Sequence, residues 1–161
     1  MEEKTVRLVP MTEALYHRFF REYAHDPDLL LPGQPYRQYT YSEEAVARYV
    51  RRQKDLRRIS LAILWGEELA GEILFKEIQA GKRATLSIVL KNASYKDRGI
   101  GTAAERLAVR YAFETLDLPT LYADAIRSNT RSQHVLEKAG FVRIREDPDF
   151  RYYRIERDAG R

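Results

Sequence analysis

The sequence predicts an α+β domain in which four helices flank a central mixed, mostly antiparallel sheet of about seven strands. Two observations support this prediction. In the middle of the chain, strand patterns follow one another across short turns, which favours antiparallel neighbours. Towards the C-terminus, helical patterns separate the strands, which gives the sheet its mixed character. Because residues 1–161 show no internal repeat, low-complexity segment or linker, we expect one domain.

The N-terminal part is predicted to contain one strand and two helices. Alternating residues at 4–10 predict a short strand that ends at a proline. Thr12 can cap the next helix, whose apolar residues recur at helical spacing and which ends near Pro27. Residues 26–41 hold three prolines and a glycine and are expected to form a long loop. Ser42 then begins the second helix.

The rest of the chain is predicted to contain three successive strands, then two helices with a strand between them, and a final hairpin. Ser128 or Asn129 can cap the last helix, and Gly140 is its expected left-handed stop. Strands are predicted at 59–65, 68–78, 84–90 and 120–127, helices at 99–116 and 129–140, and a terminal hairpin at 141–146 and 150–156.

The composition is that of a globular protein. Hydrophobic residues make up 44% and charged residues 32% of the chain, and the apolar runs are too short to span a bilayer. The first residues do not resemble a signal peptide. Without cysteine the chain can form no disulfide, thiolate metal site or cysteine nucleophile, and the three histidines show no metal-ligand spacing. We expect a cytoplasmic protein that carries no metal and does not bind membranes.

Residues 51–58, RRQKDLRR, are the one strongly basic run in a chain whose formal net charge is +4. Cations at the end of a helix complement its dipole, which is the simpler interpretation. The alternative is a contact for an acidic partner such as RNA. No aromatic stacking pattern accompanies the run, so no nucleic-acid partner is expected.

The stretch YKDRGIGTAAERL, residues 95–107, places Gly99 and Gly101 at the start of an amphipathic helix. A dinucleotide-binding turn puts its first glycine directly after the strand, whereas here residues 91–98 intervene. A P-loop is excluded because no Gly-Lys-Ser/Thr follows. The remaining interpretation is a helix N-terminus that binds phosphate, with Lys96 and Arg98 adding charge. The alternative is that the glycines only shape the loop.

Two further segments give this stretch a context. Lys96-Asp97-Arg98-Gly99-Ile100-Gly101 resembles the pattern Gln/Arg-x-x-Gly-x-Gly/Ala of the GNAT superfamily of acyl-CoA-dependent N-acyltransferases, with lysine in the Gln/Arg position. Asn129-x-x-Ser132 and Glu137-Lys-Ala-Gly-Phe141 are similar to the branch of the RimJ/RimL ribosomal-protein and SpeG-like polyamine acetyltransferases. The resemblance extends from about Leu69 to Phe141 and implies a GNAT-type sheet.

The resemblance implies acetyl-CoA as co-substrate. In this family a wedge opens between the strand that ends at Leu90 and the next one, and the pantetheine arm would run beside Val89 and Leu90. Asn129 would meet the pantetheine through its amide, and Ser132 would lie near the thioester. The pyrophosphate would rest on the backbone of residues Lys96, Asp97, Arg98, Gly99, Ile100, Gly101 and Thr102.

The expected reaction is direct attack of a primary amine on the thioester in a ternary complex. Many family members use a tyrosine as acid to the leaving thiolate, but Leu136 stands at that position here. Ser132 is the candidate acid, although a serine in a first turn can equally bond to the backbone. Glu77 is the candidate base, and Glu72, Asp124 and a water relay are alternatives.

The acceptor is expected to be a small-molecule or peptide amine, such as a polyamine or a protein N-terminus. Tyr36 and Tyr39, in the long loop, are the candidate substrate-binding residues, although simple loop packing explains them as well. A homodimer is a further expectation. Two alternative functions are an acyl-CoA sensor that lacks catalysis and a basic RNA-binding module.

Overall fold

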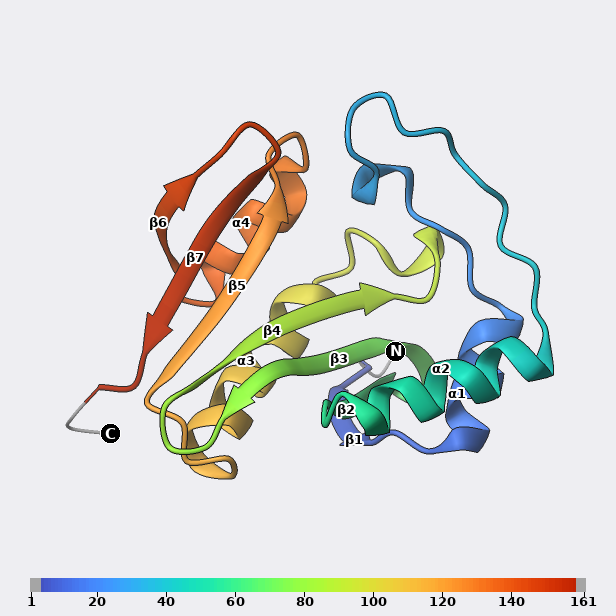
Figure 1. The fold of residues 1–161 in the computed structure, drawn as a ribbon, viewed down its shortest axis with the longest axis horizontal. Helices are drawn as coiled ribbons and strands as arrows, with labels where there is room; N and C mark the ends of the chain where they lie inside the picture. Colours follow the sequence, from blue (N-terminus) through green and yellow to red (C-terminus); the bar gives the residue numbers. More distant parts are fainter. Residues whose placement is uncertain (1–3, 159–161) are drawn as a thin grey trace.

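A computed structural model describes residues 4–158, which form seven strands and four α-helices (Figure 1). Two 3₁₀-helices, η1 and η2, lie in the segments before α2 and α3. In chain order the elements are β1 Val6–Pro10, α1 Glu13–Arg21, η1 Pro27–Leu29, α2 Glu43–Asp55, β2 Ile59–Trp65, β3 Glu68–Gln79, β4 Arg83–Leu90, η2 Ala93–Tyr95, α3 Ile100–Glu114, β5 Thr120–Ile126, α4 Thr130–Lys138, β6 Val142–Glu146 and β7 Phe150–Glu156.

The strands form one sheet in the order β1-β2-β3-β4-β5-β7-β6. All neighbouring strands pair antiparallel except β4 and β5, which run parallel with α3 as their crossover. The predicted fold class, a mixed and mostly antiparallel sheet flanked by four helices, is therefore confirmed. Most predicted ranges needed small changes, since β3 continues through Ile78 to Gln79 and η1 and η2 occupy segments expected to be irregular. The predicted end of the first helix near Pro27 was wrong, because α1 ends at Arg21 and Pro27 instead begins η1.

Three helices begin at the caps that the sequence predicted. The side chains of Thr12, Ser42 and Asn129 accept hydrogen bonds from the backbone N–H of the third residue along, at 3.1, 3.3 and 3.1 Å. Each bond satisfies one of the free N–H groups at a helix start. Gly140, with φ +103°, follows α4 in the left-handed conformation expected of a stop. The basic run falls in the last turn of α2 and the residues just after it.

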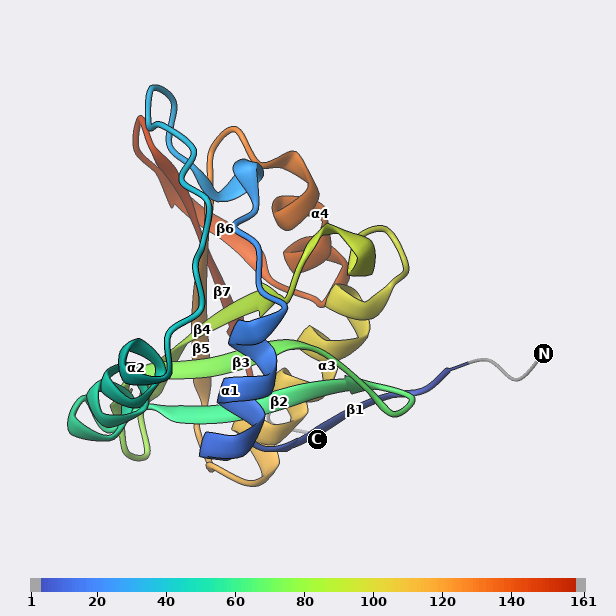
Figure 2. The same cartoon turned by 90° about the vertical axis from the view of Figure 1, so that its right-hand side faces the viewer.

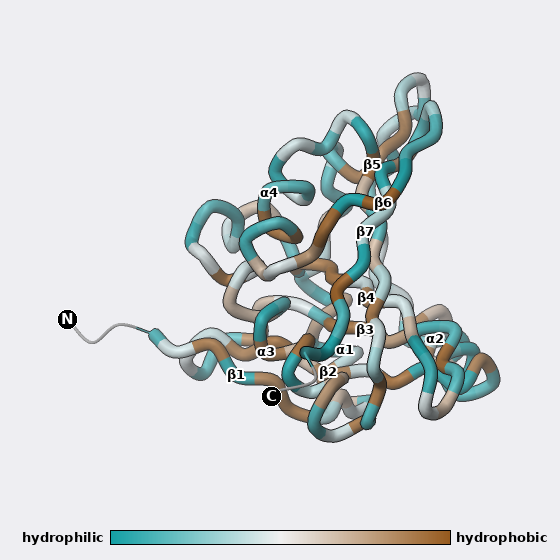
Figure 3. Tube along the Cα trace, turned by 90° about the vertical axis from the view of Figure 1, so that its left-hand side faces the viewer, coloured by the Kyte–Doolittle hydropathy of each residue, from teal (hydrophilic) through white to brown (hydrophobic). Residues whose placement is uncertain are grey.

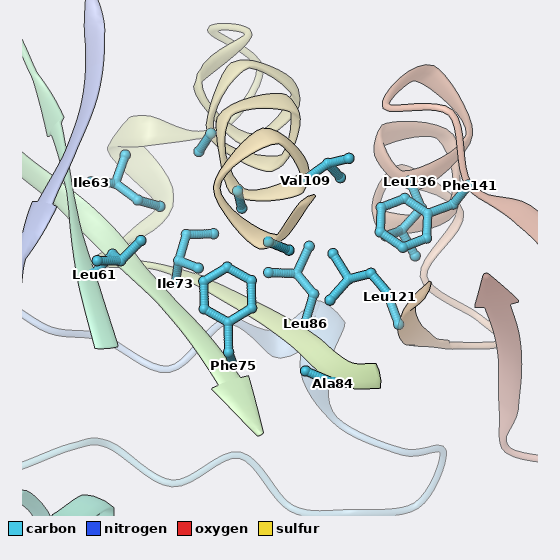
Figure 4. Close-up of a cluster of buried hydrophobic side chains, with 14 of the residues drawn as sticks. Leu61, Ile63, Ile73, Phe75, Ala84, Leu86, Val109, Leu121, Leu136 and Phe141 are labelled. Carbon is cyan, nitrogen blue, oxygen red and sulfur yellow. The ribbon is translucent and has the colours of Figure 1, made fainter. Parts of the chain in front are cut away.

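The helices α3 and α4 cover one face of the sheet (Figures 1 and 2). The inner side of α3 presents Ala104, Ala108 and Ala112, each fully buried, and these small side chains let the helix lie close to the strands. Figure 4 shows strand residues such as Phe75 and Leu86 packed beneath this helix. Hydrophobic residues concentrate in the same region, where β1 and β2 meet α3 (Figure 3).

The helices α1 and α2 pack on the opposite face (Figures 1 and 2). There Phe19 packs against Ala62 and Leu69, and Tyr16 joins Val46 and Val50. The segment between α1 and α2 leaves this face and extends towards the end of β4 (Figures 1 and 2). Among residues 4–158, no helix has the length and apolar character needed to cross a membrane.

The strands β4 and β5 pair over only part of their length. Residues Arg83–Leu86 of β4 pair with Thr120–Ala123 of β5, but β4 continues to Leu90 and β5 to Ile126. The two strands diverge at this fork, as Figure 1 shows. Because β4 is a central strand, its last residues lie beside β3 but lack a partner on the β5 side. The fork is where the resemblance placed the wedge.

Candidate functional site

Two adjoining hollows occupy the fork between β4 and β5. The outer hollow lies beside the start of α3 and includes Leu90, Lys96, Gly101 and Arg131 among its lining residues. The inner hollow reaches the point where the strands meet, at Leu86 and Ala123. The two share the lining residues Leu29, Ile88, Val89, Glu105, Asn129 and Ser132, so they form one continuous space.

Six residues that the sequence predicted for coenzyme binding come together in this space. They belong to three segments, the end of β4, the start of α3 with the loop before it, and the start of α4. The six are Val89, Leu90, Lys96, Gly101, Asn129 and Ser132. Segments that are distant in sequence therefore line one site.

The other predicted coenzyme residues lie around the hollows. Ile100 is fully buried in the core under α3. The Arg98 guanidinium lies over the Trp65 ring at 5.3 Å, and its Nε donates a hydrogen bond to the backbone oxygen of Ser94 at 2.9 Å. Asp97 pairs with Arg131 at 3.1 Å. Gly99 is the N-cap of α3 and Thr102 lies in its first turn, and neither is among the residues that line the two hollows.

The two glycines have different structural roles. Gly99 is the N-cap of α3 and has φ +76°, a left-handed conformation that glycine adopts without strain. Gly101 is already helical, and a Cβ atom there would come to an ordinary 3.7 Å from a methyl group of Val135. Since Gly101 lines the outer hollow, a larger side chain would project into it. Glycine at position 99 is therefore needed for its left-handed backbone conformation, whereas glycine at position 101 keeps the outer hollow free of a side chain.

The start of α3 is open to an anion. Within the described residues, α3 is the α-helix whose N-cap makes no side-chain hydrogen bond, and its first turn carries no acidic residue. The N–H groups of a first helical turn have no partner inside the helix, and the helix dipole adds partial positive charge. Such an end can bind phosphate.

The cations beside this helix end are engaged by carboxylates. Lys96 forms ion pairs with Asp26 and, at 3.4 Å, with Asp28. Arg131 pairs with Asp28 at 3.1 Å. Asp26 and Asp28 come from the segment that leads from α1 to α2, so this segment is attached to both walls of the outer hollow.

At the start of α4, Asn129 and Ser132 are held by one local bond. The Asn129 side-chain oxygen accepts the backbone N–H of Ser132 at 3.1 Å and so caps the helix. The Ser132 hydroxyl lines both hollows and has no hydrogen-bond partner within residues 4–158. The alternative interpretation was that the Ser132 hydroxyl bonds to the backbone of its own helix. Among the described residues, this bond is not formed.

Glu105 is a lining residue that the sequence analysis missed. It lies one helical turn after Gly101, on the same side of α3, and lines both hollows although the residue is only 1% exposed. Its Oε2 atom has no hydrogen-bond partner among the described residues. Burial raises the pKa of this carboxyl group to about 8. The spacing of four residues from Gly101 is the signal that could have found it.

Three carboxyl groups on the opposite face are candidates for the base. Glu72 is 3% exposed, its Oε1 accepts a hydrogen bond from the Tyr49 hydroxyl at 2.9 Å, and burial raises its pKa to about 7. Asp124 lines the inner hollow, and partial burial raises its pKa. Glu77 is exposed at an irregular point of β3 with φ +51° and lines a third hollow, which Asp124 also borders.

The two tyrosines predicted to bind substrate lie outside the lining of both hollows. Tyr36 is 51% exposed, and its hydroxyl donates a hydrogen bond to the backbone oxygen of His25 at 3.2 Å. Tyr39 packs edge-on against Tyr23, with ring centroids 5.1 Å apart, and Tyr23 lines the outer hollow. Tyr39 is therefore one side chain removed from the site.

Among residues 4–158, no group of three or more candidate ligand side chains could hold a metal ion.

Comparisons with known proteins agree with this geometry. The acetyltransferase (GNAT) domain family matches residues 5–142. A putative ribosomal N-acetyltransferase, YdaF of Bacillus subtilis, is 31% identical over 104 residues, which is 64% of this chain and 56% of that protein. Spermidine N(1)-acetyltransferase of Escherichia coli K12 is 27% identical over 109 residues, 67% of this chain and 56% of that protein.

The chain thus spans little more than half the length of these curated relatives. Among solved structures, spermidine N-acetyltransferase from Vibrio cholerae in complex with CoA and spermine is similar with a TM-score of 0.77. That match has 15% identity and covers 94% of this chain and 95% of the other, so it shows the fold. The family match over most of its length shows that this chain belongs to the GNAT acetyltransferase family, and its fold agrees.

Proposed function

We propose that this protein transfers an acetyl group from acetyl-CoA to a primary amine. The observation that carries the proposal is the fork of β4 and β5, whose hollows begin at the open N-terminus of α3. The pyrophosphate would bind the first-turn N–H groups of α3 beside Gly101. The pantetheine arm would lie along Val89 and Leu90, where β4 lacks a partner and its edge can accept an extended ligand.

In the proposed reaction the amine nitrogen attacks the thioester carbonyl in the inner hollow. A carbon–nitrogen bond forms, the carbon–sulfur bond breaks, and CoA leaves as a thiolate. The Ser132 hydroxyl, which has no partner among residues 4–158 and whose residue lines both hollows, would stabilise this thiolate by donating a hydrogen bond. Direct transfer needs no nucleophile on the protein, which is consistent with the lack of cysteine.

Asp124 is the proposed base, because it lines the inner hollow and its raised pKa makes it a better proton acceptor. Burial is the main cause of this raised pKa; the charge of Lys76 opposes it, and the charge of the nearby Glu77 adds a smaller upward contribution. Glu77 would thus act through Asp124 rather than on the amine. We expect Asp124→Asn to lower kcat about 100-fold and Glu77→Gln only a few-fold. Equal losses would contradict this assignment.

The proposed acceptor is a polyamine, another small amine or a protein N-terminus. The E. coli and V. cholerae relatives are named for spermidine and the B. subtilis relative for the ribosome. Tyr36 and Tyr39 remain proposed acceptor contacts, Tyr39 beside Tyr23 at the outer hollow and Tyr36 where its hydroxyl bonds to the backbone of His25. A cytoplasmic location, assembly into a homodimer and the organisation as one domain stay predictions.

The decisive experiment measures release of CoA thiol from acetyl-CoA with a panel of polyamines, aminoglycosides, amino acids and N-terminal peptides. Turnover with one class of amine, dependent on Asp124, is the expected result. Calorimetry with acetyl-CoA is the companion measurement. Binding without turnover on any amine would favour the acyl-CoA sensor, and no binding at micromolar concentration would overturn the proposal.

A further inference from the structure

Three polar side chains lie in the region that the two hollows share, and one of them differs from the others. Asn129 uses its side-chain oxygen to cap α4. Ser132 lies at the same helix start. Glu105 projects from the other wall, on α3, and lines both hollows. It is the one of the three that carries a titratable group.

The surroundings of Glu105 do not explain a carboxyl group there. Its neighbours on the inner side of α3, Ala104 and Ala108, are fully buried in the apolar core. Its own Oε2 is buried and has no hydrogen-bond partner among residues 4–158. Leaving a buried polar atom unpaired costs about 1–3 kcal/mol. A carboxyl group of this kind therefore calls for a ligand or another functional reason.

The charge of this group follows from its position. Burial raises the pKa of Glu105 to about 8, and no charged neighbour contributes to the shift. At neutral pH the group is therefore mostly protonated and can both donate and accept a hydrogen bond. The charged or titratable residues that line the same hollows are Tyr23, Asp26, Lys96 and Arg131 in the outer hollow and Lys76 and Asp124 in the inner hollow.

The position of Glu105 fits one part of acyl-CoA. The phosphates would bind one helical turn earlier, at Gly101, and the thioester would lie deeper, at the fork. Between them runs the pantetheine arm, which carries amide groups and a hydroxyl. The exposed edge of β4 can pair with one side of this arm, and Glu105 faces the same space from α3.

We propose that the Glu105 carboxyl group is a hydrogen-bonding anchor for the pantetheine arm of acyl-CoA. This inference rests on the proposed function, because it assumes that acyl-CoA binds in the two hollows. In the free protein the Oε2 atom of this carboxyl group has no hydrogen-bond partner among residues 4–158, and the bound ligand would supply one. Glu105 thereby fixes how far the thioester enters the inner hollow.

The test compares two variants and two ligands by calorimetry. Glu105→Met keeps a similar length but cannot form a strong hydrogen bond, whereas Glu105→Gln stays neutral and still donates and accepts. Acetyl-CoA contains the pantetheine arm, and 3′-phosphoadenosine 5′-diphosphate lacks it. We expect Glu105→Met to weaken acetyl-CoA binding about tenfold or more and to leave the nucleotide within about twofold. Glu105→Gln should bind both ligands within about threefold of the natural protein.

Thermal unfolding without ligand distinguishes this anchor from a purely structural residue. Because Glu105→Met removes a buried polar group that has no partner, we expect the ligand-free variant to unfold at a higher temperature. Unchanged affinity of Glu105→Met for acetyl-CoA would overturn the inference alone. A lower unfolding temperature with equal losses for both ligands would also overturn it. If the natural protein bound neither ligand, the proposed function would fail as well.

Discussion

The two faces of the sheet differ in how their buried polar groups are satisfied. On the α1 and α2 face, the Tyr16 hydroxyl donates to Ser60 at 2.6 Å and the Tyr49 hydroxyl donates to Glu72 at 2.9 Å. The Tyr16 and Tyr49 rings also meet edge to face, with centroids 5.3 Å apart. These polar groups bond mostly to one another, and the exception among the described residues is Oε2 of Glu72, which is buried without a hydrogen-bond partner. The face therefore resembles a packed core with an internal polar network.

On the α3 and α4 face, polar groups point into the hollows instead. The start of α3 has no capping side chain, the Ser132 hydroxyl is free, and Oε2 of Glu105 is buried without a partner within the described chain. A protein tolerates such groups where a ligand pairs with them. The difference supports the proposal that the two hollows form the donor site and that this site is already shaped in the free protein. Under the proposed function, we expect acceptor recognition to depend on the segment between α1 and α2.

The largest expected effect comes from blocking the donor site. Gly101→Leu would place a branched side chain in the outer hollow, and we expect acetyl-CoA binding to weaken at least about 100-fold, or about 3 kcal/mol. The fold should persist, because leucine favours a helix more than glycine does. Calorimetry measures the affinity, and circular dichroism checks the fold. Gly101→Ala is the matched control with a smaller loss. Normal affinity of Gly101→Leu would contradict the placement of the phosphates.

A smaller effect is expected from Ser132→Ala. Loss of the hydroxyl removes a donor to the leaving thiolate, so kcat should fall about 10- to 100-fold. The affinity for acetyl-CoA should change less than about twofold, because the cap of α4 uses the Ser132 backbone. Steady-state kinetics and calorimetry together separate the two quantities. An equal loss in kcat and affinity would mean that Ser132 binds the donor rather than assisting its departure.

The sequence predicted which residues line the two hollows better than it predicted the position of the proposed acceptor contacts, for physical reasons. Gly99 and Gly101 signal a backbone requirement that depends on local conformation, and Asn129 signals a cap, so both motifs carry their meaning in a few adjacent residues. Glu105 escaped notice because on a helical wheel it looks like an exposed residue beside the apolar stripe. Its burial depends on how the β4–β5 fork and α4 meet α3.

The acceptor side lacks such local signals. Tyr36 and Tyr39 lie in a segment whose path depends on distant ion pairs, those of Asp26 and Asp28 with Lys96 and Arg131. The sequence could not show that Glu77 faces a third hollow, because an irregularity in the pairing of β3 and β4 alters its direction. These placements arise from tertiary contacts, which spacing along the chain does not record.

The two buried carboxyl groups predict a difference in pH dependence between the faces. The pKa of Glu105 rises to about 8 and that of Glu72 to about 7, above an ordinary value of 4.5. The folded chain then holds protons that the unfolded chain has lost, so the free energy of unfolding falls as pH rises through these ranges. Glutamine does not titrate, so Glu105→Gln removes the part of this decrease that Glu105 causes. That part is at most about 1.4 kcal/mol of unfolding free energy per pH unit.

Urea unfolding at several pH values measures this effect. The advantage of Glu105→Gln over the natural protein should grow from about pH 5 to about pH 8, and that of Glu72→Gln should stop growing near pH 7. Glu114→Gln, at the exposed end of α3, is the control and should give a constant difference. A constant difference for Glu105→Gln would contradict the raised pKa.

The smallest expected effect tests whether the segment between α1 and α2 competes with the donor. Asp28 pairs with both Lys96 and Arg131 at the mouth of the outer hollow. Asp28→Asn would leave these cations more available to phosphate, so acetyl-CoA affinity should rise about threefold at low salt and lose this gain at high salt. Calorimetry at two salt concentrations measures the change, and Glu114→Gln alters the net charge equally at a distant site. A fall in affinity would instead mean that Asp28 holds Lys96 and Arg131 in place for the donor, so that the segment on the α1 and α2 face completes the donor site.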